Sequence, residues 1–195
     1  MAYSRRVLGA LREDWRRYYG DGASARELPH ALLAQGLWAC AEYRFGVWAR
    51  REAPAPIRPV AVFLSIFTHL VVESLTGISI SPGARIGPGL YIGHFGSIIV
   101  NKGAALGAGC TLSQEVTIGQ DVTPPYGVPT VGRGVYFAPG VKAFGEITIG
   151  DHVAIGANAV VRESLPDRAI AVGIPARVVR IQEPDEVSVA AIARD

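Results

Sequence analysis

Residues 149–161 read IGDHVAIGANAVV, with a branched apolar residue at every sixth position: Ile149, Ile155 and Val161. The six-residue spacing extends back to residue 80, with a two-residue slip after residue 98 and a longer break after residue 118. The apolar positions of the series are Ile80, Ile86, Ile92, Ile98, Val100, Leu106, Leu112, Ile118, Val131, Phe137, Ala143, Ile149, Ile155 and Val161. Glycine or alanine often follows them.

This period decides the fold class. An amphipathic helix repeats its apolar face every 3.6 residues and a half-buried strand every two residues, so neither explains a repeat of six. Short strands joined by tight corners do explain it, because each coil then stacks on the previous one and places one apolar side chain inside. Glycine suits the corner backbone, which a side chain would strain. The sequence therefore predicts a β-helix from residue 76 to residue 182.

Glycine usage separates this repeat from the region before it. Residues 1–75 hold five of the 23 glycines, and the other 18 lie between Gly77 and Gly173. The first region reads as helices: one ends at Gly20, a second is broken by the proline-rich residues 53–59, and a third begins near Pro59. The third is apolar nearly all round, so we expect it to be buried against the repeat or another subunit. Residues 183–195 are interpreted as a tail.

Composition limits the functional classes. The chain is 49% hydrophobic and 18% charged, as is typical of a globular protein. Its net charge of +2 is too small to indicate nucleic-acid binding. The longest apolar run, residues 60–72, is shorter than the ~20 residues of a membrane span. We therefore expect no membrane span, and a peripheral contact stays open.

The two cysteines, Cys40 and Cys110, lie in differently patterned regions and are expected to be buried free thiols. Cysteine and histidine do not cluster at metal-ligand spacing, so no metal site is expected. With no apolar run typical of a secretory signal, these features predict a cytoplasmic protein.

The repeat resembles the serine acetyltransferase family, in particular the branch found beside polysaccharide-biosynthesis enzymes. The matching runs are Ile86-Gly-Pro-Gly-Leu-Tyr-Ile-Gly-His94, Thr117-Ile-Gly119, Ile155-Gly-Ala-Asn-Ala-Val-Val161 and Val172-Gly-Ile-Pro-Ala-Arg-Val-Val179. The resemblance spans Gly77 to Val179, about half the chain. It implies a left-handed parallel β-helix with an N-terminal helical region, acetyl-CoA as donor, and homotrimers with active sites at subunit boundaries.

His94 stands where this family has its general base. Acetyl transfer to an alcohol needs a group that takes the hydroxyl proton, and an imidazole titrates near neutral pH. His94 comes two residues after a core position, so its side chain is free of the interior. The other histidines have simpler explanations: His30 as a solvated residue, His69 as a hydrogen-bonded core residue, and His152 as an exposed corner residue.

The acceptor residues of the family are missing. Where serine acetyltransferases carry an aspartate fifteen residues before the base, this chain has Ser79, and where they carry one immediately before it, Gly93. The loop 120–130 lacks the family's Arg-His pair. Stacked coils place His94 near Gln114 and Glu115, so Glu115 is proposed as its partner or as an acceptor contact; a solvated charge is the alternative.

The resemblance also indicates where the donor would lie, along a groove between adjacent β-helices. The positions matched to CoA contacts are Gly119, Ala138, Pro139, Gly156 and Ala157, with Lys142 and Arg177 at the basic positions near the nucleotide. Cations there would complement phosphate. Each of these residues could equally be a structural corner or a solvated charge.

Three functions remain open. The first is an acetyl-CoA-dependent O-acetyltransferase acting on the hydroxyl of a sugar or glycan intermediate, since the serine-binding residues are missing. The second is a serine O-acetyltransferase with an altered acceptor site. The third is a catalytically silent β-helix that serves as an assembly partner.

Overall fold

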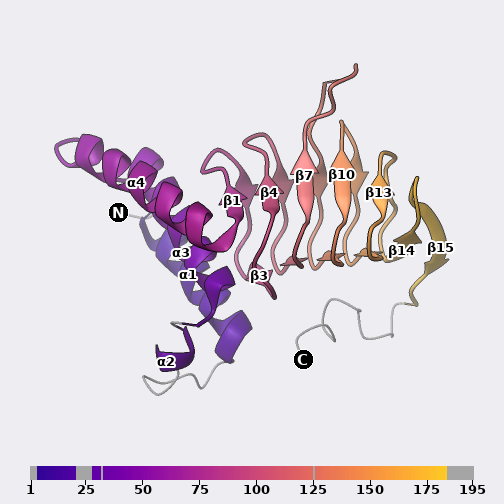
Figure 1. The fold of residues 1–195 in the computed structure, drawn as a ribbon, viewed down its shortest axis with the longest axis horizontal. Helices are drawn as coiled ribbons and strands as arrows, with labels where there is room; N and C mark the ends of the chain where they lie inside the picture. The colour runs from indigo at the N-terminus through magenta and orange to yellow at the C-terminus, as the bar shows by residue number, and fades with distance from the viewer. Residues whose placement is uncertain (1–3, 21–27, 32, 125, 184–195) are drawn as a thin grey trace.

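The computed structural model describes residues 4–20, 28–31, 33–124 and 126–183 (Figure 1). Helices occupy one end of an elongated molecule and a column of short strands forms the rest (Figure 1). The helices are α1 (Ser4–Tyr19), α2 (Leu28–Ala31), α3 (Gln35–Arg51) and α4 (Arg58–Thr76). The chain therefore changes from helix to strand between Thr76 and Ile78.

The strands form three sheets that run along the column, and from β1 to β13 successive strands go to successive sheets. Sheet A contains β1 (Ile78–Ile80), β4 (Ile98–Val100), β7 (Thr117–Gly119), β10 (Lys142–Phe144) and β13 (Val160–Val161). Sheet B contains β2 (Arg85–Ile86), β5 (Ala105–Leu106), β8 (Thr130–Val131) and β11 (Thr148–Ile149). Sheet C contains β3 (Tyr91–Ile92), β6 (Thr111–Leu112), β9 (Tyr136–Phe137), β12 (Ala154–Ile155), β14 (Ala169–Val172) and β15 (Arg177–Ile181). The predicted parallel β-helix with an N-terminal helical region is confirmed.

The register explains the six-residue period. Ile155 pairs with Phe137 and Phe137 with Leu112, all in parallel ladders, so equivalent apolar positions stack in the interior. These side chains are fully or almost fully buried. Coils approach closely at the corners: a Cβ on Gly107 would lie 2.6 Å from the carbonyl carbon of Gly132. A side chain at this corner would force neighbouring coils apart.

The two-residue slip in the repeat is a longer corner. Ile92 pairs with Leu112, twenty residues on, whereas Ile99 pairs with Thr117, eighteen residues on. In this register residue 98 stands opposite residue 116. The corner from sheet C to sheet A therefore takes five residues, 93–97, in the first coil, whereas the equivalent corner of the second coil takes three, 113–115. The extra backbone stands at the end of the column that meets α4.

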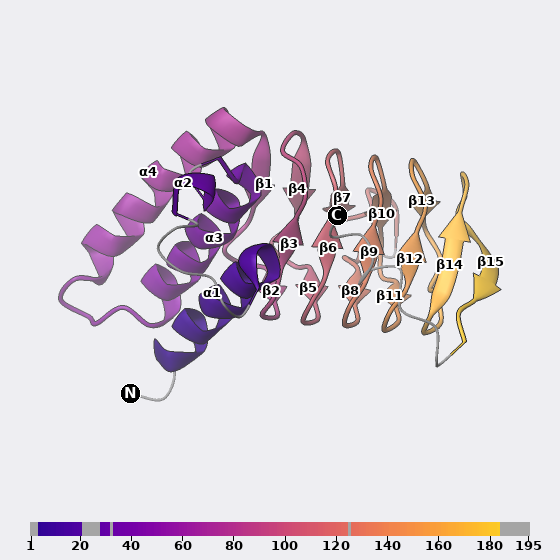
Figure 2. The same cartoon turned by 90° about the horizontal axis from the view of Figure 1, so that it is seen from below.

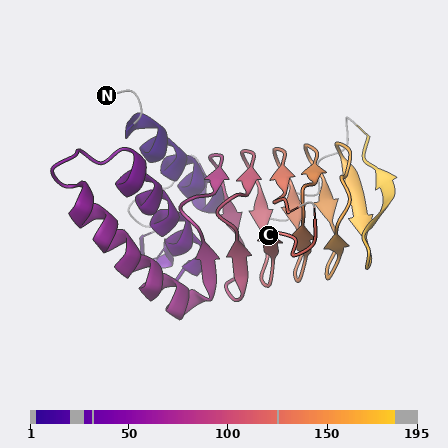
Figure 3. The same cartoon turned by 90° about the horizontal axis from the view of Figure 1, so that it is seen from above.

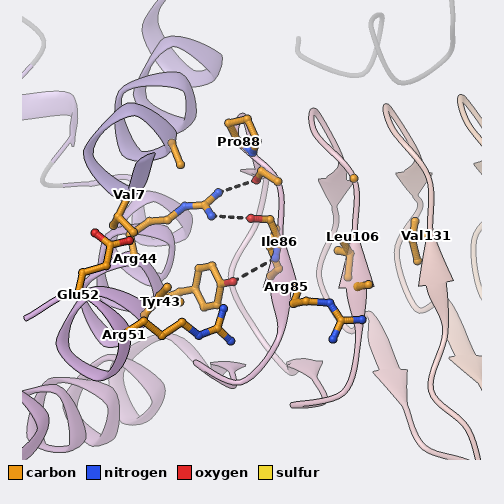
Figure 4. Close-up of a pocket in the computed structure, with 15 residues that line it drawn as sticks. Val7, Tyr43, Arg44, Arg51, Glu52, Arg85, Ile86, Pro88, Leu106 and Val131 are labelled. Atoms are coloured by element: carbon orange, nitrogen blue, oxygen red, sulfur yellow. Dashed lines mark hydrogen bonds between the residues drawn. The ribbon is translucent and has the colours of Figure 1, made fainter. Parts of the chain in front are cut away.

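Side chains of the helices close the N-terminal edge of the β-helix. Tyr18 Oη accepts from the Ile92 amide and donates to the Ile92 carbonyl, both at 3.0 Å. Tyr43 Oη accepts from the Ile86 amide at 3.1 Å (Figure 4). It donates to the Ala84 carbonyl at 3.0 Å. Two tyrosines thus replace the missing neighbouring strand.

A buried ion pair completes this N-terminal cap. Arg44 donates to both carboxylate oxygens of Asp14, at 2.8 and 3.0 Å. It also donates to the Ile86 and Gly87 carbonyls, both at 2.7 Å (Figure 4). Asp14 accepts from the Leu90 amide at 2.8 Å. Burial opposes the charge on Arg44, but the hydrogen bonds to Asp14 and the negative charge of Asp14, with smaller contributions from Tyr43 and Cys40, together outweigh it and raise the pKa of the guanidinium. The Arg44 guanidinium therefore stays charged and hydrogen-bonded inside the cap.

The C-terminal end is closed by backbone. β15 turns back and pairs antiparallel with β14, the one antiparallel ladder recorded in the described strands. Gln182, which is 2% exposed, donates from its side chain to the carbonyls of His152 at 3.0 Å and Arg168 at 3.2 Å. A folded-back strand thus covers the last coil (Figure 2).

The third predicted helix, α4, is not buried within the chain. It packs on α3, which lies between α1 and α4 (Figure 3), but its outer side exposes large apolar residues. These are Val60, Phe63, Leu64, Ile66, Phe67, Leu70, Val71 and Leu75. The expected burial against the repeat is therefore wrong. α4 is also long and apolar enough to cross a membrane, with 17% of its apolar window buried, so the absence of a membrane span stays a prediction.

Candidate active site

One edge of the β-helix collects most of the predicted site residues. It consists of the corners that lead from sheet C to sheet A, residues 93–97, 113–115, 138–140 and 156–158, and we call it the His94 edge. Pairing of β3, β6, β9 and β12 stacks these corners in order. Since neighbouring strands lie about 4.8 Å apart, the edge extends roughly 14 Å from the first corner to the fourth. An extended ligand could lie along it.

The backbone around His94 is held on both sides. The Gly93 amide donates to the Leu112 carbonyl at 3.2 Å, and the Gly96 amide donates to the Thr76 carbonyl at 2.9 Å. The second bond joins the corner to the last turn of α4. Gly77 ends α4 with a positive φ of 67°, and a Cβ on Gly77 would lie 3.0 Å from the Ser97 amide nitrogen. The long corner therefore rests directly on the helix end.

The His94 side chain is exposed on this fixed backbone. In the part of the chain that the structure describes, no hydrogen bond or ion pair holds its imidazole. Phe95 beside it is 60% exposed, and Ile99 at the start of the next face is 51% exposed. The base predicted from the sequence is thus accessible to a substrate and is bordered by apolar surface.

Glu115 lies in the neighbouring corner but aligns with a different residue. Its amide donates to the Gly96 carbonyl at 2.9 Å, so it stacks two residues beyond His94. Its side chain is exposed, and its carbonyl oxygen accepts a hydrogen bond from Lys142 Nζ. The structure places Gln114, rather than Glu115, beside the His94–Phe95 step. A role for Glu115 stays a prediction.

Four of the predicted donor contacts lie on the His94 edge. Ala138 and Pro139 form the third corner, about 10 Å from the first, and Gly156 and Ala157 the fourth. Gly156 also has a packing reason to be glycine, because a Cβ there would lie 2.7 Å from Val172 Cγ1. Lys142 begins β10 next to the edge. These residues are brought together as the sequence predicts, and their contact with a donor stays a prediction.

Two predicted donor contacts lie elsewhere. Gly119 ends β7 on the other side of sheet A, and its missing Cβ is explained by the Phe144 ring, whose Cε1 would lie 2.8 Å away. Arg177 begins β15 near the last coil and pairs with Glu163 at 3.0 Å. The six-residue spacing alone did not show that Gly119 and Arg177 lie off the His94 edge.

The loop after β7 stands out from the column beyond the other corners (Figure 1). Asp121 anchors it: its carboxylate accepts from the Thr123 amide at 3.1 Å and hydroxyl at 2.9 Å, and it pairs with Arg162 of a later coil. The Thr123 bonds and the Arg162 charge lower the pKa of Asp121. In residues 120–130 the sequence has no arginine or histidine. This loop thus carries no cation for a carboxylate substrate.

Ser79 and Gly93 offer no charge either. Ser79 lies in β1, half-buried, with its ladder partner Ile99 beside it. Gly93 begins the long corner, and a Cβ there would meet only the Tyr91 ring, at 3.5 Å. Packing therefore leaves room for a side chain at Gly93, so a substituent there is tolerated. Where the resemblance leads us to expect carboxylates, the chain therefore has a hydroxyl and a hydrogen.

A hollow of about 550 Å³ lies away from the His94 edge, between the helices and sheet B (Figure 4). Ile86, Leu106 and Val131 line its apolar side. Its buried polar groups, Tyr43 and Arg44, already bond to the first coil, so they serve the N-terminal cap. In the residues that the structure describes, no group of three or more metal-ligating side chains occurs.

Comparisons with known proteins agree with this architecture. No protein-family model matches the chain. It is 40% identical over 172 residues to the serine acetyltransferase of Helicobacter pylori strain J99, covering 82% of this chain and 90% of that protein. It is 34% identical over 167 residues to that of Mycobacterium tuberculosis, covering 85% and 73%.

Solved structures show the same fold. The serine acetyltransferase of Brucella abortus strain S19 superposes with a TM-score of 0.76 at 24% identity, covering 91% of this chain and 70% of that one. A serine acetyltransferase in complex with CoA gives 0.71 at 25% identity, covering 91% and 72%. The shared part includes the helices as well as the β-helix, since both comparisons span nine-tenths of the chain.

Proposed function

This chain belongs to the serine acetyltransferase family, and from this premise we propose that it transfers an acetyl group from acetyl-CoA to the hydroxyl of L-serine, at an altered acceptor site. The observation that carries the proposal is the match to serine acetyltransferases over most of both chains. That the chain is an acyltransferase using acetyl-CoA is supported by the same relatives and by their complexes with CoA.

His94 is the proposed general base. Its imidazole takes the proton of the acceptor hydroxyl while the hydroxyl oxygen attacks the thioester carbonyl. A C–O bond forms, and the tetrahedral intermediate then collapses with cleavage of the C–S bond. The imidazolium returns the proton to the sulfur, so the products are the acetyl ester and CoA thiol. Accessibility of His94 on a fixed corner supports this role.

The donor is proposed to lie along the His94 edge. Placing the thioester at the first corner puts the pantetheine arm over Ala138, Pro139, Gly156 and Ala157, which present little side-chain bulk. Lys142 stands beside this path, where its ammonium would complement a phosphate. Gly119 and Arg177 lie off the His94 edge, and their contact with the donor, in the groove between adjacent β-helices, stays a prediction.

A second class of acceptor, hydroxyl compounds without charged groups, is also proposed because neither Ser79 nor Gly93 carries a charge. A free amino acid brings an ammonium and a carboxylate, which charged side chains would normally match. Neither position carries a charge, and the loop 120–130 has no cation. A hydroxyl compound without these charges, such as a sugar in polysaccharide biosynthesis, would need no such partners. The comparisons do not support this acceptor, so serine is the leading candidate.

We also propose that the enzyme is a homotrimer. The exposed outer side of α4 supports association, because monomeric proteins seldom expose apolar patches larger than ~300–600 Å². Phe95 and Ile99, in the corner and strand that follow His94, are also exposed apolar residues. Sedimentation equilibrium on the full chain tests the stoichiometry, and a monomer at micromolar concentration would contradict it.

CoA release tests the function directly. The protein is supplied with acetyl-CoA and, separately, L-serine, simple sugars or sugar nucleotides, and the thiol product is followed with a chromogenic reagent. We expect turnover with L-serine that falls roughly 100-fold or more in His94→Ala. Turnover with a sugar and none with serine would replace the first acceptor by the second. Acetyl-CoA binding without any turnover would contradict both.

A further inference from the structure

Gln114 has a polar atom that the fold does not use. Its side-chain oxygen Oε1 is shielded from solvent and accepts no hydrogen bond within the described part of the chain. Exchanging the amide oxygen and nitrogen would leave a shielded donor instead, so the mismatch does not depend on the orientation of the amide. Leaving such a group unpaired destabilises the folded state, and native proteins rarely retain one without a use.

The register places Gln114 against the catalytic corner. The bond from Gly93 to the Leu112 carbonyl and the bond from Glu115 to the Gly96 carbonyl enclose His94 and Phe95 on one coil and Ser113 and Gln114 on the next. Gln114 is itself fixed from the other side, since its carbonyl accepts from the Gly140 amide at 3.0 Å. Its backbone is thus held between two coils, in the corner that stacks on the one carrying His94.

The His94 imidazole needs a hydrogen-bond acceptor, and Gln114 has one that the fold does not use. A base that takes a proton must present a ring nitrogen with a free lone pair, so its other nitrogen must keep the hydrogen. An acceptor near that second nitrogen fixes the tautomer and the ring orientation. Ser79, in the position of the family's aspartate, is half-buried in β1 and carries no charge. No such acceptor is bonded to the exposed imidazole.

The charged groups nearby do not fill this role. Glu115 points to solvent from a position over Gly96. Lys142 donates to the Glu115 carbonyl, and Glu73 of α4 lies 3.4 Å from His69 Nε2. From both elements that pack on the corner, the charged side chains are therefore engaged or directed elsewhere.

We propose that Gln114 is the positioning residue of His94. Its Oε1 accepts the N–H of one ring nitrogen of His94 and leaves the other nitrogen as the base. The contact requires the exposed imidazole and the shielded Gln114 amide to turn toward each other about their side-chain bonds, and catalytic hydrogen bonds of this kind often tighten only with substrate. The inference deepens the proposed function, because it rests on His94 as the base, and it gives a neutral amide the task of a carboxylate.

Two substitutions separate positioning from structure. Gln114→Leu keeps the bulk and removes the acceptor; kcat should fall about 10- to 100-fold, part of the ~10²–10⁴ that a positioned base contributes, with the KM for acetyl-CoA unchanged. Gln114→Glu keeps an acceptor and adds a charge that favours the imidazolium. It should retain turnover and move the acid limb of the kcat/KM profile to higher pH by about one unit.

A matched control exists in the same chain. Gln35, at the start of α3, also has a shielded Oε1 without a partner, but it lies off the His94 edge. Gln35→Leu should leave the pH profile of kcat/KM in place. A similar loss of kcat in both leucine variants, with unshifted profiles, would mean that shielded glutamines matter only for folding and would overturn the proposal.

The tautomer of His94 provides a readout that needs no turnover. In ¹⁵N-histidine-labelled protein, the ring signals that vanish in His94→Ala identify this residue. Saturating CoA should leave one dominant tautomer in the native chain and a mixture in Gln114→Leu. Identical spectra in both would overturn the proposal even if the enzyme is active, whereas an inactive native enzyme with the expected spectra would contradict only the proposed function.

Discussion

The two ends of the β-helix solve the same problem with different chemistry. Every open sheet edge leaves backbone groups that must be paired or covered. At the N-terminal end, side chains from α1 and α3 bond to the first coil: Tyr18, Tyr43 and the Asp14–Arg44 pair. At the C-terminal end, the chain folds back and β15 bonds to β14 through its own backbone. His94 belongs to the coil that side chains hold.

This difference shows which end of the β-helix depends more strongly on particular side chains. A backbone ladder forms with almost any side chains, whereas the N-terminal cap depends on four particular ones. Two of these are charges whose burial is favourable only while both are present. The first coil, with the corner that carries His94, therefore depends on distant helical residues.

The largest expected effect is the loss of the buried charge pair. Asp14→Ala leaves Arg44 buried without its anion and should lower the free energy of unfolding by about 3–5 kcal/mol. Gln182→Ala, which removes two hydrogen bonds at the opposite end, should cost only about 1 kcal/mol. Urea denaturation of the two variants measures both. Equal losses would refute the distinction between the ends.

A smaller effect is expected from single hydroxyls of the N-terminal cap. Tyr43→Phe keeps the ring but leaves the Ala84 carbonyl and Ile86 amide unpaired, which should cost about 1–3 kcal/mol. Tyr136→Phe is the matched control, because the Tyr136 hydroxyl in β9 has no recorded partner in the described chain. Thermal unfolding of both should show a clear decrease in Tm only for the first.

The smallest effect should come from an exposed charge pair on the later coils. Arg133 donates to Asp151 from its backbone at 2.6 Å and from its side chain, and these bonds lower the pKa of Asp151. The unfolded chain then takes up the proton first as pH falls, so this contribution is present at neutral pH and lost in acid. The small difference in unfolding free energy between the native chain and Asp151→Asn should disappear as pH falls below the usual aspartate range; a constant difference would exclude a charge effect.

The sequence predicted the repetitive half far better than the helical half. Six-residue spacing is a local signal that every coil repeats, so the β-helix and the stacking of Ile92 on Leu112 follow from counting. The spacing also detected the two-residue slip but placed it after residue 98, whereas the register places the extra residues just before, in the corner 93–97 that carries His94. Asp14 and Arg44 are thirty residues apart and bond to a third segment, and no periodicity connects them. The N-terminal cap therefore required the structure.

Counting residues along the repeat was not sufficient to decide which residues are neighbours within the candidate site. It placed Gln114 and Glu115 together near His94, but the two extra residues of the long corner decide which one is adjacent. Gly119 and Arg177 were assigned by resemblance, and only the observed strand ends show that they leave the edge. Register errors of one or two residues are harmless for the fold and decisive for the chemistry.

The folded-back strand β15 has a consequence for how this protein can change over generations. Since β15 pairs with β14 through backbone alone and every coil presents the same ladder, a whole coil is an exchangeable unit. Adding or deleting eighteen residues in the middle of the column would preserve both ends and alter only the length of the His94 edge. The number of coils thus sets the length of the His94 edge, and with it the length of an extended ligand that the edge could hold beside His94.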